Sequence, residues 1–450
     1  MKVVMIVVLL SVLTWEAGYS QTGEQRLKVI EERVSRIEQK LERIFELLSL
    51  PDQQQELRAI REETAAVAEE ARAARAESIE SPQREASPAV TAVVSPGAAD
   101  ASEEVVNVPY SGYMELHLNH DNLNPTTLDF HRFVLLFGHG FGERIRFWSE
   151  LELEHAFVEG GEASGELELE QAFLDFLIHS KFNFRTGMLL APVGLINERH
   201  EPPSFNGVER PFVDTVIVPT TWFASGAGIL GDLGKGFSYK TYLMSSLDAT
   251  QFSAEEGFRE GRQKGFFENA RNLAVVGRLD YRGVPGLNLG TSFWTGETGF
   301  NFRDLNGRAL IFETDGRYRL GRLEGRGQIV ITRLKDAAEI NRALQRQKGV
   351  NPNIAEKMLG FYLEGGVSLV PAHFAQDIVA FYRYENFDTQ YRMPEGFLPL
   401  KQFDRSAHVL GLTYFPYPDI AFKIDYNFMR NASAVIKPPD RWNLGVGWWF

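Results

Sequence analysis

The sequence has 450 residues, a net charge of −13 and no cysteine. The acidic balance argues against a nucleic-acid-binding protein, which needs a basic face, and the lack of cysteine excludes disulfide frameworks and thiolate chemistry. Beyond the extreme N-terminus no apolar run reaches about eighteen residues, which argues against a membrane protein built from helices. The 33 Phe and 40 Gly instead suit long antiparallel strands joined by tight turns.

The first twenty residues have the layout of a secretory signal peptide. Lys2 supplies a short positive region, and residues 3–13 are almost entirely apolar. Gly18 and Ser20 are the small residues expected before a cleavage site. We therefore predict that residues 1–20 are an export signal, with a retained hydrophobic anchor as the alternative. Export without cysteine favours a bacterial envelope protein.

A heptad pattern occupies the next segment. Its apolar residues alternate in spacing between three and four, as in the a/d seam of a coiled coil. They are Leu27, Ile30, Val34, Ile37, Leu41, Ile44 and Leu48. Leu or Val at a with Ile at d favours assemblies larger than dimers. We predict a trimeric coiled coil over residues 21–50; the alternative is a single amphipathic helix lying on the following domain.

Residues 51–107 are predicted to connect this coil to the rest of the chain. Their first half is rich in Ala, Glu and Arg, which favour helix. Pro82, Pro88 and Pro96 then interrupt a stretch of Ser, Ala and Val. That composition is typical of a flexible or partly extended linker.

From residue 108 onward the hydrophobic period changes to two. In ERIRFWSELELEHAF (143–157) apolar and charged side chains alternate, and the same alternation recurs at 420–428 and 441–450. Successive side chains of a strand point to opposite faces, so each segment has one apolar and one polar face. About sixteen such segments extend over residues 108–450, joined alternately by short turns and long connections.

This pattern predicts an all-β fold, a sixteen-stranded antiparallel transmembrane β-barrel preceded by the α-helical coiled coil. Alternating short turns and long loops are typical of such barrels, and strands of about ten residues suffice to cross a bilayer. A soluble β-sandwich is the alternative, but its strands average about five or six residues. In a barrel the apolar faces meet lipid and the charged faces line water, because one lipid-facing Arg at the midplane costs about 2–4 kcal/mol.

The final residues, NLGVGWWF (443–450), place a polar residue, a Gly and two aromatics at fixed spacing before a terminal Phe. They resemble the C-terminal strand signature that the outer-membrane barrel assembly machinery reads. The residues concerned are Asn443, Gly445, Trp448 and Phe450. Aromatic residues near strand ends are predicted to anchor the barrel at the membrane interfaces; these are Tyr110, Tyr113, Trp222, Trp442 and Trp448.

Four further stretches carry a family resemblance. They are FRTGMLLAPVGLINE (184–198), VPTTWFASGAGILGDL (218–233), FYRYENFDTQ (381–390) and LGLTYFPYPDIAFKIDYNF (410–428). With the final strand they resemble the bacterial phosphate-selective porin O and P superfamily, whose members form sixteen-stranded barrels. The coil and linker resemble periplasmic extensions of some exported porins. Phosphate-binding members carry a dense ladder of Arg, whereas the third and fourth predicted strands here are rich in Glu.

The resemblance implies a barrel narrowed by its third long connection, residues 194–214, folded inward. Pro202 and Pro203 would stiffen this loop. Because pore selectivity depends on diameter and on the charges at the narrowest ring, the charged residues of loop and wall are the candidates. The predicted pore-lining or constriction residues are Arg144, Arg146, Glu150, Glu152, Glu154, Glu166, Glu168, Lys181, Arg185, Arg199, Glu201, Glu209, Arg210, Arg317, Arg319, Arg322, Arg326, Arg383, Glu385, Lys423 and Asp425.

The implied function is an outer-membrane porin for passive diffusion of small hydrophilic or ionic solutes, including anions such as phosphate. Its expected partners are outer-membrane lipids, two further copies in a homotrimer and the solutes, with the coiled coil in the periplasm. The alternative is a structural protein that tethers the outer membrane to the periplasmic cell wall. We expect no enzyme, since no G-x-S-x-G elbow is present. No cofactor or metal is expected either, because the nine His lack metal-site spacing.

Overall fold

The computed structural model describes residues 110–450, apart from 157–164, 300–301, 303–304, 350 and 372. The predictions of a signal peptide, a coiled coil and a linker fall on residues 1–109 and therefore lie outside the described residues. Among the described residues no helix combines the length and the hydropathy needed to cross a bilayer.

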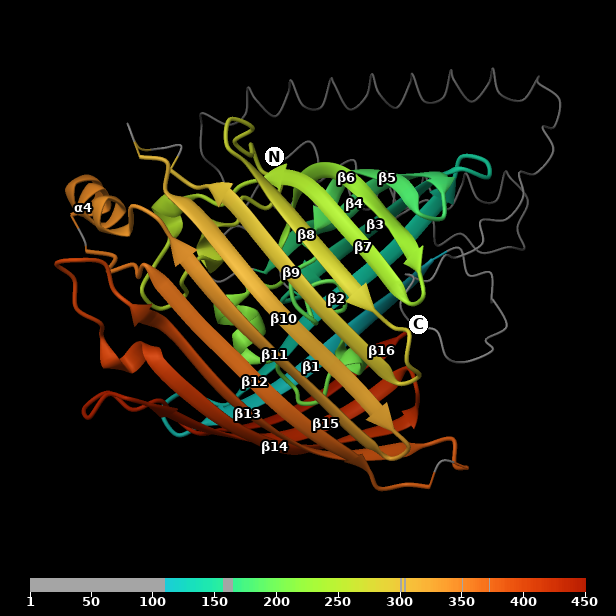
Figure 1. The fold of residues 1–450 in the computed structure, drawn as a ribbon. Helices are drawn as coiled ribbons and strands as arrows, with labels where there is room; N and C mark the ends of the chain where they lie inside the picture. The colour runs from blue at the N-terminus through green and yellow to red at the C-terminus, as the bar shows by residue number, and fades with distance from the viewer. Residues whose placement is uncertain (1–109, 157–164, 300–301, 303–304, 350, 372) are drawn as a thin grey trace, which may run out of the picture. The chain divides into compact units, whose positions relative to one another are not determined.

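Sixteen antiparallel strands close into one barrel, each paired with its neighbours in the chain, and the first strand pairs with the last (Figure 1). The predicted all-β class, strand number and antiparallel topology are confirmed. The strands are β1 (Ser111–Asp121), β2 (Thr127–Gly140), β3 (Ile145–Glu154), β4 (Glu166–His179), β5 (Phe182–Leu190), β6 (Phe223–Gly234), β7 (Phe237–Ser245), β8 (Leu273–Tyr281), β9 (Leu287–Glu297), β10 (Arg308–Leu320), β11 (Leu323–Leu334), β12 (Lys357–Ser368), β13 (Asp377–Arg392), β14 (Asp404–Tyr417), β15 (Ile420–Asn431) and β16 (Arg441–Trp449).

The connections differ at the two ends of the barrel. At the turn end, where β1 begins and β16 ends, tight turns such as 321–322 join the strands. At the loop end lie the long connections, of which we name residues 191–222 loop L3 and residues 246–272 loop L4. Short helices occur in these loops and before β14: η2 (Pro202–Ser204), η3 (Val213–Ile217), η4 (Ala249–Gln251), η5 (Arg259–Gly261), α4 (Ala337–Lys348) and η6 (Lys401–Phe403).

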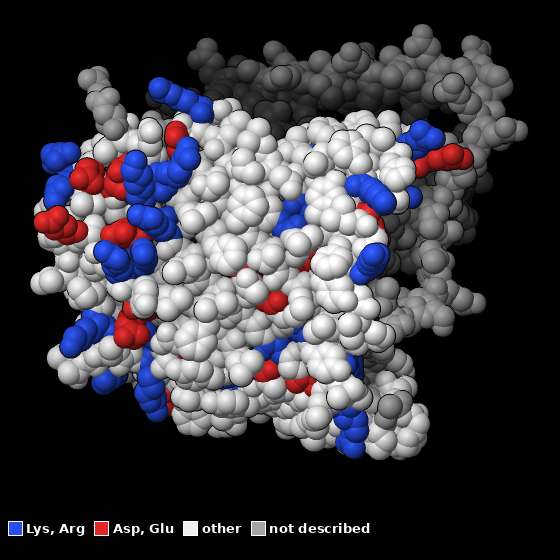
Figure 2. Space-filling view, in the orientation of Figure 1, with Lys and Arg blue, Asp and Glu red and all other residues white. Residues whose placement is uncertain are grey.

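The period-two pattern sorts the side chains between the two faces of the barrel. On β11, Ile329 and Ile331 are 53% and 41% exposed on the outside, whereas the inward Gln328 is only 4% exposed. On β15, Phe422 is exposed beside the buried Lys423. Figure 2 shows the result: the surface across the middle of the strands is mostly free of charge, and Lys, Arg, Asp and Glu gather toward the barrel ends.

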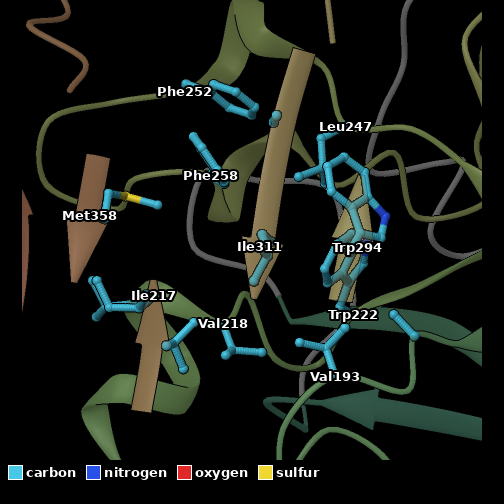
Figure 3. Packing of buried hydrophobic residues seen from close by; sticks show 14 of the residues in the cluster. Val193, Ile217, Val218, Trp222, Leu247, Phe252, Phe258, Trp294, Ile311 and Met358 are labelled. Carbon is cyan, nitrogen blue, oxygen red and sulfur yellow. The ribbon is translucent and has the colours of Figure 1, made fainter. Parts of the chain in front are cut away.

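Part of the interior is nevertheless apolar, which the sequence analysis did not anticipate. Near the loop end, Trp294 on β9 and Ile311 on β10 point inward and are fully buried. They pack against L3 and L4 in the cluster of Figure 3. Trp222 of L3, for example, contacts Trp294 with ring centroids 5.3 Å apart. On this side of the barrel, apolar side chains therefore also face the interior.

Helix α4 extends this apolar cluster. Its buried residues Ile340, Ala343 and Leu344 recur at helical spacing and form one apolar stripe. Gly349 follows the last residue of the helix, and its φ of 69° is the left-handed conformation common after a helix C-terminus. The stripe attaches this loop to the barrel interior.

Two of the predicted interface aromatics are wrong. Tyr113 has 0% exposure and Trp222 has 2% exposure, and both lie inside the barrel, whereas Tyr110 and Trp442 are about half exposed. Tyr113 shares the inward face of β1 with Glu115, so the period of two requires it to face inward. Trp222 belongs to L3 rather than to a strand, and its ring packs in the apolar cluster.

Candidate pore and constriction

Loop L3 lies inside the barrel. It leaves the wall between β5 and β6, yet its backbone donates hydrogen bonds to inward side chains far around the circle. Leu195 N donates to Gln328 Oε1 on β11 at 3.0 Å, and Val213 N donates to Glu385 Oε2 on β13 at 3.1 Å. Val208 N donates to Asp425 Oδ2 on β15 at 2.6 Å. These bonds satisfy buried backbone donors that would otherwise make the position costly.

The backbone of L3 needs glycine at two of its closest approaches to the wall. Gly194 and Gly207 have φ values of 78° and 84°, a conformation that side chains disfavour. A Cβ on Gly194 would lie 3.2 Å from the Gln328 amide of β11, and one on Gly207 would lie 3.4 Å from the Asp425 carboxylate of β15. Both glycines therefore help L3 to follow the wall closely.

The wall opposite the origin of L3 carries a paired charge network. The guanidinium of Arg383 lies 2.7 Å from Glu385 and 3.0 Å from Glu364. Arg326 lies 2.7 Å from the same Glu364, which also accepts a hydrogen bond from the Asn206 amide of L3 at 3.0 Å. All four charged side chains are at most 8% exposed. Pairing makes their burial tolerable, since an unpartnered buried charge would be strongly destabilising.

On the near side, His200 of L3 is held between carboxylates of the wall. Its Nε2 lies 3.0 Å from Glu170 and 3.5 Å from Glu150, and Glu150 also accepts a hydrogen bond from the Tyr113 hydroxyl at 3.3 Å. Burial alone would lower the pKa of His200, but the two carboxylates outweigh it and raise the pKa to about 10. His200 is therefore a cation at neutral pH.

Further along L3, Glu209 makes the corresponding contact to β1. Its carboxylate lies 3.3 Å from His117 Nδ1 and accepts a hydrogen bond from the Asn119 amide at 2.8 Å. Burial would raise the pKa of Glu209, but these two partners lower it well below its usual range. L3 is thus fixed to both sides of the barrel by charge-assisted contacts.

Two cavities lie on opposite sides of L3. The inner vestibule, of about 590 Å³, opens toward the turn end, and the outer cavity, of about 200 Å³, lies toward the loop end. They share no lining residue. The layer between them includes Tyr113, Glu150 and His200. This layer is the candidate constriction.

The inner vestibule is rich in basic side chains. Eight Lys and Arg line it, against five Asp and Glu. The basic residues are Arg146, Arg185, Arg199, Lys240, Arg278, Arg282, Arg317 and Arg326, and the acidic residues are Glu143, Asp175, Glu198, Asp280 and Asp315. Burial lowers the pKa of Arg199, and the neighbouring charge of Arg282 lowers it further. The outer cavity differs, with six Glu against five Lys and Arg.

Most predicted pore residues reach the interior. Those on the inner vestibule are Arg146, Arg185, Arg199, Arg317 and Arg326. Those on the outer cavity are Glu152, Glu154, Glu168, Glu209 and Arg210, and Glu166 pairs with Lys264 beside it at 2.8 Å. A third set lies between the cavities, either within L3 or in contact with it. Its members are Glu150, Glu201, Arg383, Glu385, Lys423 and Asp425.

Four predicted wall residues lie at the turn end, away from both cavities and from L3. Arg144 and Lys181 lie in exposed turns of the turn end, where the period of two that placed them on the wall no longer applies. Arg319 is 3.9 Å from Asp377, and Arg322 donates to the Ser368 carbonyl oxygen at 2.8 Å. Both lie beside the turn between β10 and β11, too near the barrel end to line the cavities.

Several interior residues escaped the sequence analysis. Arg278 on β8 lies 2.7 Å from Asp315, and Arg132 on β2 lies 2.5 Å from Glu115. Arg278 and Asp280 alternate with apolar neighbours, so the period of two was sufficient to find them. The contact between Glu364 and Arg326 required the fold, because it joins separate strands.

The comparisons agree with this architecture. The structure resembles that of Salmonella typhi OmpF in complex with daunomycin, with a TM-score of 0.51 and 12% identity over 76% of this chain and 97% of that one. It is also similar to an anion-selective porin from Comamonas acidovorans, with a TM-score of 0.47 and 12% identity over 76% and 98% of the two chains. The sixteen-stranded barrel of this chain therefore has the fold of Salmonella typhi OmpF.

No family model matches the chain. In sequence it is 34% identical over 365 residues to an uncharacterized protein of Aquifex aeolicus (strain VF5), a match that covers 79% of this chain and 83% of the relative. The protein belongs to the same family as this Aquifex protein.

Proposed function

We propose that the protein is an outer-membrane porin that lets small hydrophilic or ionic solutes diffuse passively through its barrel. The observation that carries the proposal is L3, a charged loop held inside a barrel whose outward strand faces are mostly apolar. Charged cavities on both sides of this loop support an aqueous path. In this proposal the protein is a channel and not an enzyme, and its homotrimer contacts outer-membrane lipids.

The inner vestibule suggests which solutes pass. Its excess of Arg and Lys favours anions, because a pore selects by the charges nearest its narrowest part. Arg199 of L3 faces this vestibule together with Arg282 and Arg317. Guanidinium groups suit carboxylate and phosphate oxygens, which they can bind in a bidentate manner. Anions such as phosphate are therefore the proposed solutes, in line with the resemblance to the phosphate-selective porin superfamily.

Reversal of one charge tests this function. Arg199→Glu in the full chain should shift the reversal potential across a salt gradient toward cation selectivity, measured in planar bilayers. Arg144→Glu is the matched control, since Arg144 lies in an exposed turn outside the vestibule and should leave the potential unchanged. A purified barrel that never conducts would refute the channel. Equal potentials in wild type and Arg199→Glu would refute the role of the vestibule.

A structural tether is the second candidate function. The heptad seam of residues 27–48 supports it, because a coiled coil in the periplasm could reach the cell wall. Export by residues 1–20 and assembly through Asn443, Gly445, Trp448 and Phe450 belong to both proposals. In the barrel, Phe450 closes the terminal pair by donating its N–H to the Gly112 carbonyl oxygen at 2.9 Å.

A further inference from the structure

Three histidines, two on β1 and β2 and one directly after β3, meet at the loop end of these successive strands. The ring of His117 stacks on that of His131 at 4.6 Å between centroids, and His131 lies 5.4 Å from His155. The carboxylate of Asp129 contacts both His131 and His155. Its Oδ2 lies 3.1 Å from His131 Nδ1 and 2.8 Å from His155 Nδ1.

Two backbone irregularities bring these side chains together. On β2 the register against β1 shifts between Glu115 and His117, so β2 carries an extra residue there. This β-bulge lets both His131 and Arg132 face the outer cavity. His155 directly follows β3 and has a φ of 50°, which is unusual for a residue with a side chain. It also remains paired to β2, because its N–H donates to the His131 carbonyl oxygen at 2.9 Å.

The three donor atoms are suited to a transition-metal ion. Zn²⁺ binds imidazole nitrogen at about 2.0–2.1 Å, which places tetrahedral ligands about 3.3 Å apart. Asp129 Oδ2 lies 2.8 Å from His155 Nδ1 and 3.1 Å from His131 Nδ1, so these two distances need to lengthen only slightly. All three donor atoms lie within 4.8 Å of one another. Imidazole with one carboxylate favours zinc, copper or nickel over calcium or magnesium. Three protein ligands would leave a fourth position for water.

The surroundings favour a cation and allow it to enter. The side chains of Asp129, His131 and His155 are 33%, 20% and 51% exposed. Next to His131, Arg132 is paired with Glu115, Glu152 and Glu154, and Glu209 contacts His117, so the nearby guanidinium charge is balanced by carboxylates. Arg132 Nη2 lies 2.8 Å from His131 Nε2. Metal binding at Nδ1 leaves a proton on this Nε2, so the guanidinium must turn toward Glu152 and Glu154.

A second group of possible ligands, Glu150, Glu170 and His200, is less suitable. All three are buried, and both ring nitrogens of His200 already have partners, Glu170 and the Asn197 carbonyl oxygen. This group fixes L3 to the wall. It offers no free ring nitrogen to a metal ion.

We propose that Asp129, His131 and His155 form a binding site for a divalent transition-metal ion of the zinc class at the loop end of the barrel. The site is independent of the proposed function, because it needs only the fold of β1 to β3. It places the ion beside the outer cavity and next to His117, which in turn contacts Glu209 of L3.

Metal titration of the full chain in detergent tests the site. Zn²⁺ is titrated in competition with a chromophoric chelator, and Co²⁺ is titrated while its visible absorption is recorded. We expect one ion per chain and a Co²⁺ spectrum of four-coordinate intensity. His155→Ala and Asp129→Asn should each weaken Zn²⁺ binding about tenfold or more, a scale typical of damage to a metal site.

The controls separate a lost ligand from a misfolded barrel. His139 lies on β2, the strand that carries Asp129 and His131, but at its turn end. His139→Ala should therefore leave the Zn²⁺ affinity unchanged. His155 lies outside the strands and is half exposed, so its substitution should preserve the β-sheet circular dichroism spectrum. Absence of stoichiometric Zn²⁺ binding, or equal affinity in wild type and a folded His155→Ala variant, would overturn the proposal. Since no conductance is measured, either result leaves the porin proposal standing.

Discussion

At the scale of single residues, His200 shows how one buried cation can hold a loop. Its imidazolium lies between Glu170 and Glu150 and offsets the charge of these two buried carboxylates. Removal of one member of a buried pair costs about 3–5 kcal/mol. His200 is therefore the residue on which the attachment of L3 to β3 and β4 depends most directly.

The raised pKa of His200 makes this attachment depend on pH. The folded-state pKa of about 10 lies above the ordinary value of 6.5. The stabilisation is therefore complete below about pH 6.5 and is lost as the pH rises through about 10. We expect amide hydrogen exchange in L3 to accelerate over this range in wild type and to be fast at all pH values in His200→Gln. His139→Gln should behave as wild type; a His200→Gln variant with wild-type protection would contradict this role.

Glu170 shows, at the same scale, why an alternating pattern can mislead. The pairing of β3 with β4 shifts between Glu150 and Leu151, which leaves Glu170 as the extra residue of a bulge. Before the bulge Glu168 faces the interior, and after it Phe173 and Asp175 do so. A bulge reverses which positions point inward. Glu168 and Glu170 both line the outer cavity, whereas Asp175, which is out of phase with them, lines the inner vestibule and was not among the predicted pore residues.

At the scale of elements, L3 controls how much of the barrel stays open. It separates the inner vestibule of about 590 Å³ from the outer cavity of about 200 Å³. Its apolar half, around η3, is buried by inward residues of β10 to β12, and its polar half is held by carboxylates. An element fixed at both ends and along its length should restrict flow without moving.

Shortening L3 should therefore widen the pore. We expect deletion of residues 199–210 to raise single-channel conductance several-fold, because these residues lie between the cavities while the apolar half of L3 remains in place. Deletion of residues 433–438, in the loop between β15 and β16, is the control, since that segment lines neither cavity. Unchanged conductance in the folded L3 variant would show that the constriction lies elsewhere.

The N-terminal coiled coil, a prediction outside the described residues, has a separate role in the proposed function. We expect a chain lacking residues 21–105 to retain single-channel conductance, because the described barrel closes through β1 and β16 without them. If the coil forms the trimer, light scattering in detergent should show a smaller assembly for this variant. If this variant lost conductance per barrel, the barrel and the N-terminal segment would not have separate roles. Envelope defects without loss of conductance would favour the tether.

At the scale of the whole molecule, the side chains on the outward faces of the strands determine whether lipid or water is the suitable surrounding for the barrel. Ile329 lies near the middle of β11 and points outward, 53% exposed. In a barrel surrounded by lipid, Ile329→Arg should lower the free energy of unfolding by about 2–4 kcal/mol, measured by urea titration in lipid vesicles. Leu323→Arg, on the same face but at the turn end, should cost about 0–1 kcal/mol. Equal effects at both positions would argue against a membrane around this wall.

The sequence by itself determined the class of fold. Its period of two fixed which face of each strand is apolar, and its alternation of short and long connections fixed the antiparallel order, because both are local properties of neighbouring residues. Strand number and the interior position of residues such as Arg326 and Lys423 followed from that pattern.

Only the tertiary structure decided what meets inside the barrel. The apolar cluster around Trp222 and Trp294 and the carboxylates that hold L3 join segments far apart in the chain, and the contact of His131 with His155 needs the bulge in β2. Such contacts depend on barrel closure and on bulges that reverse the pattern. An alternating sequence specifies which side of a strand a residue takes, but the closed sheet determines which residues it meets there.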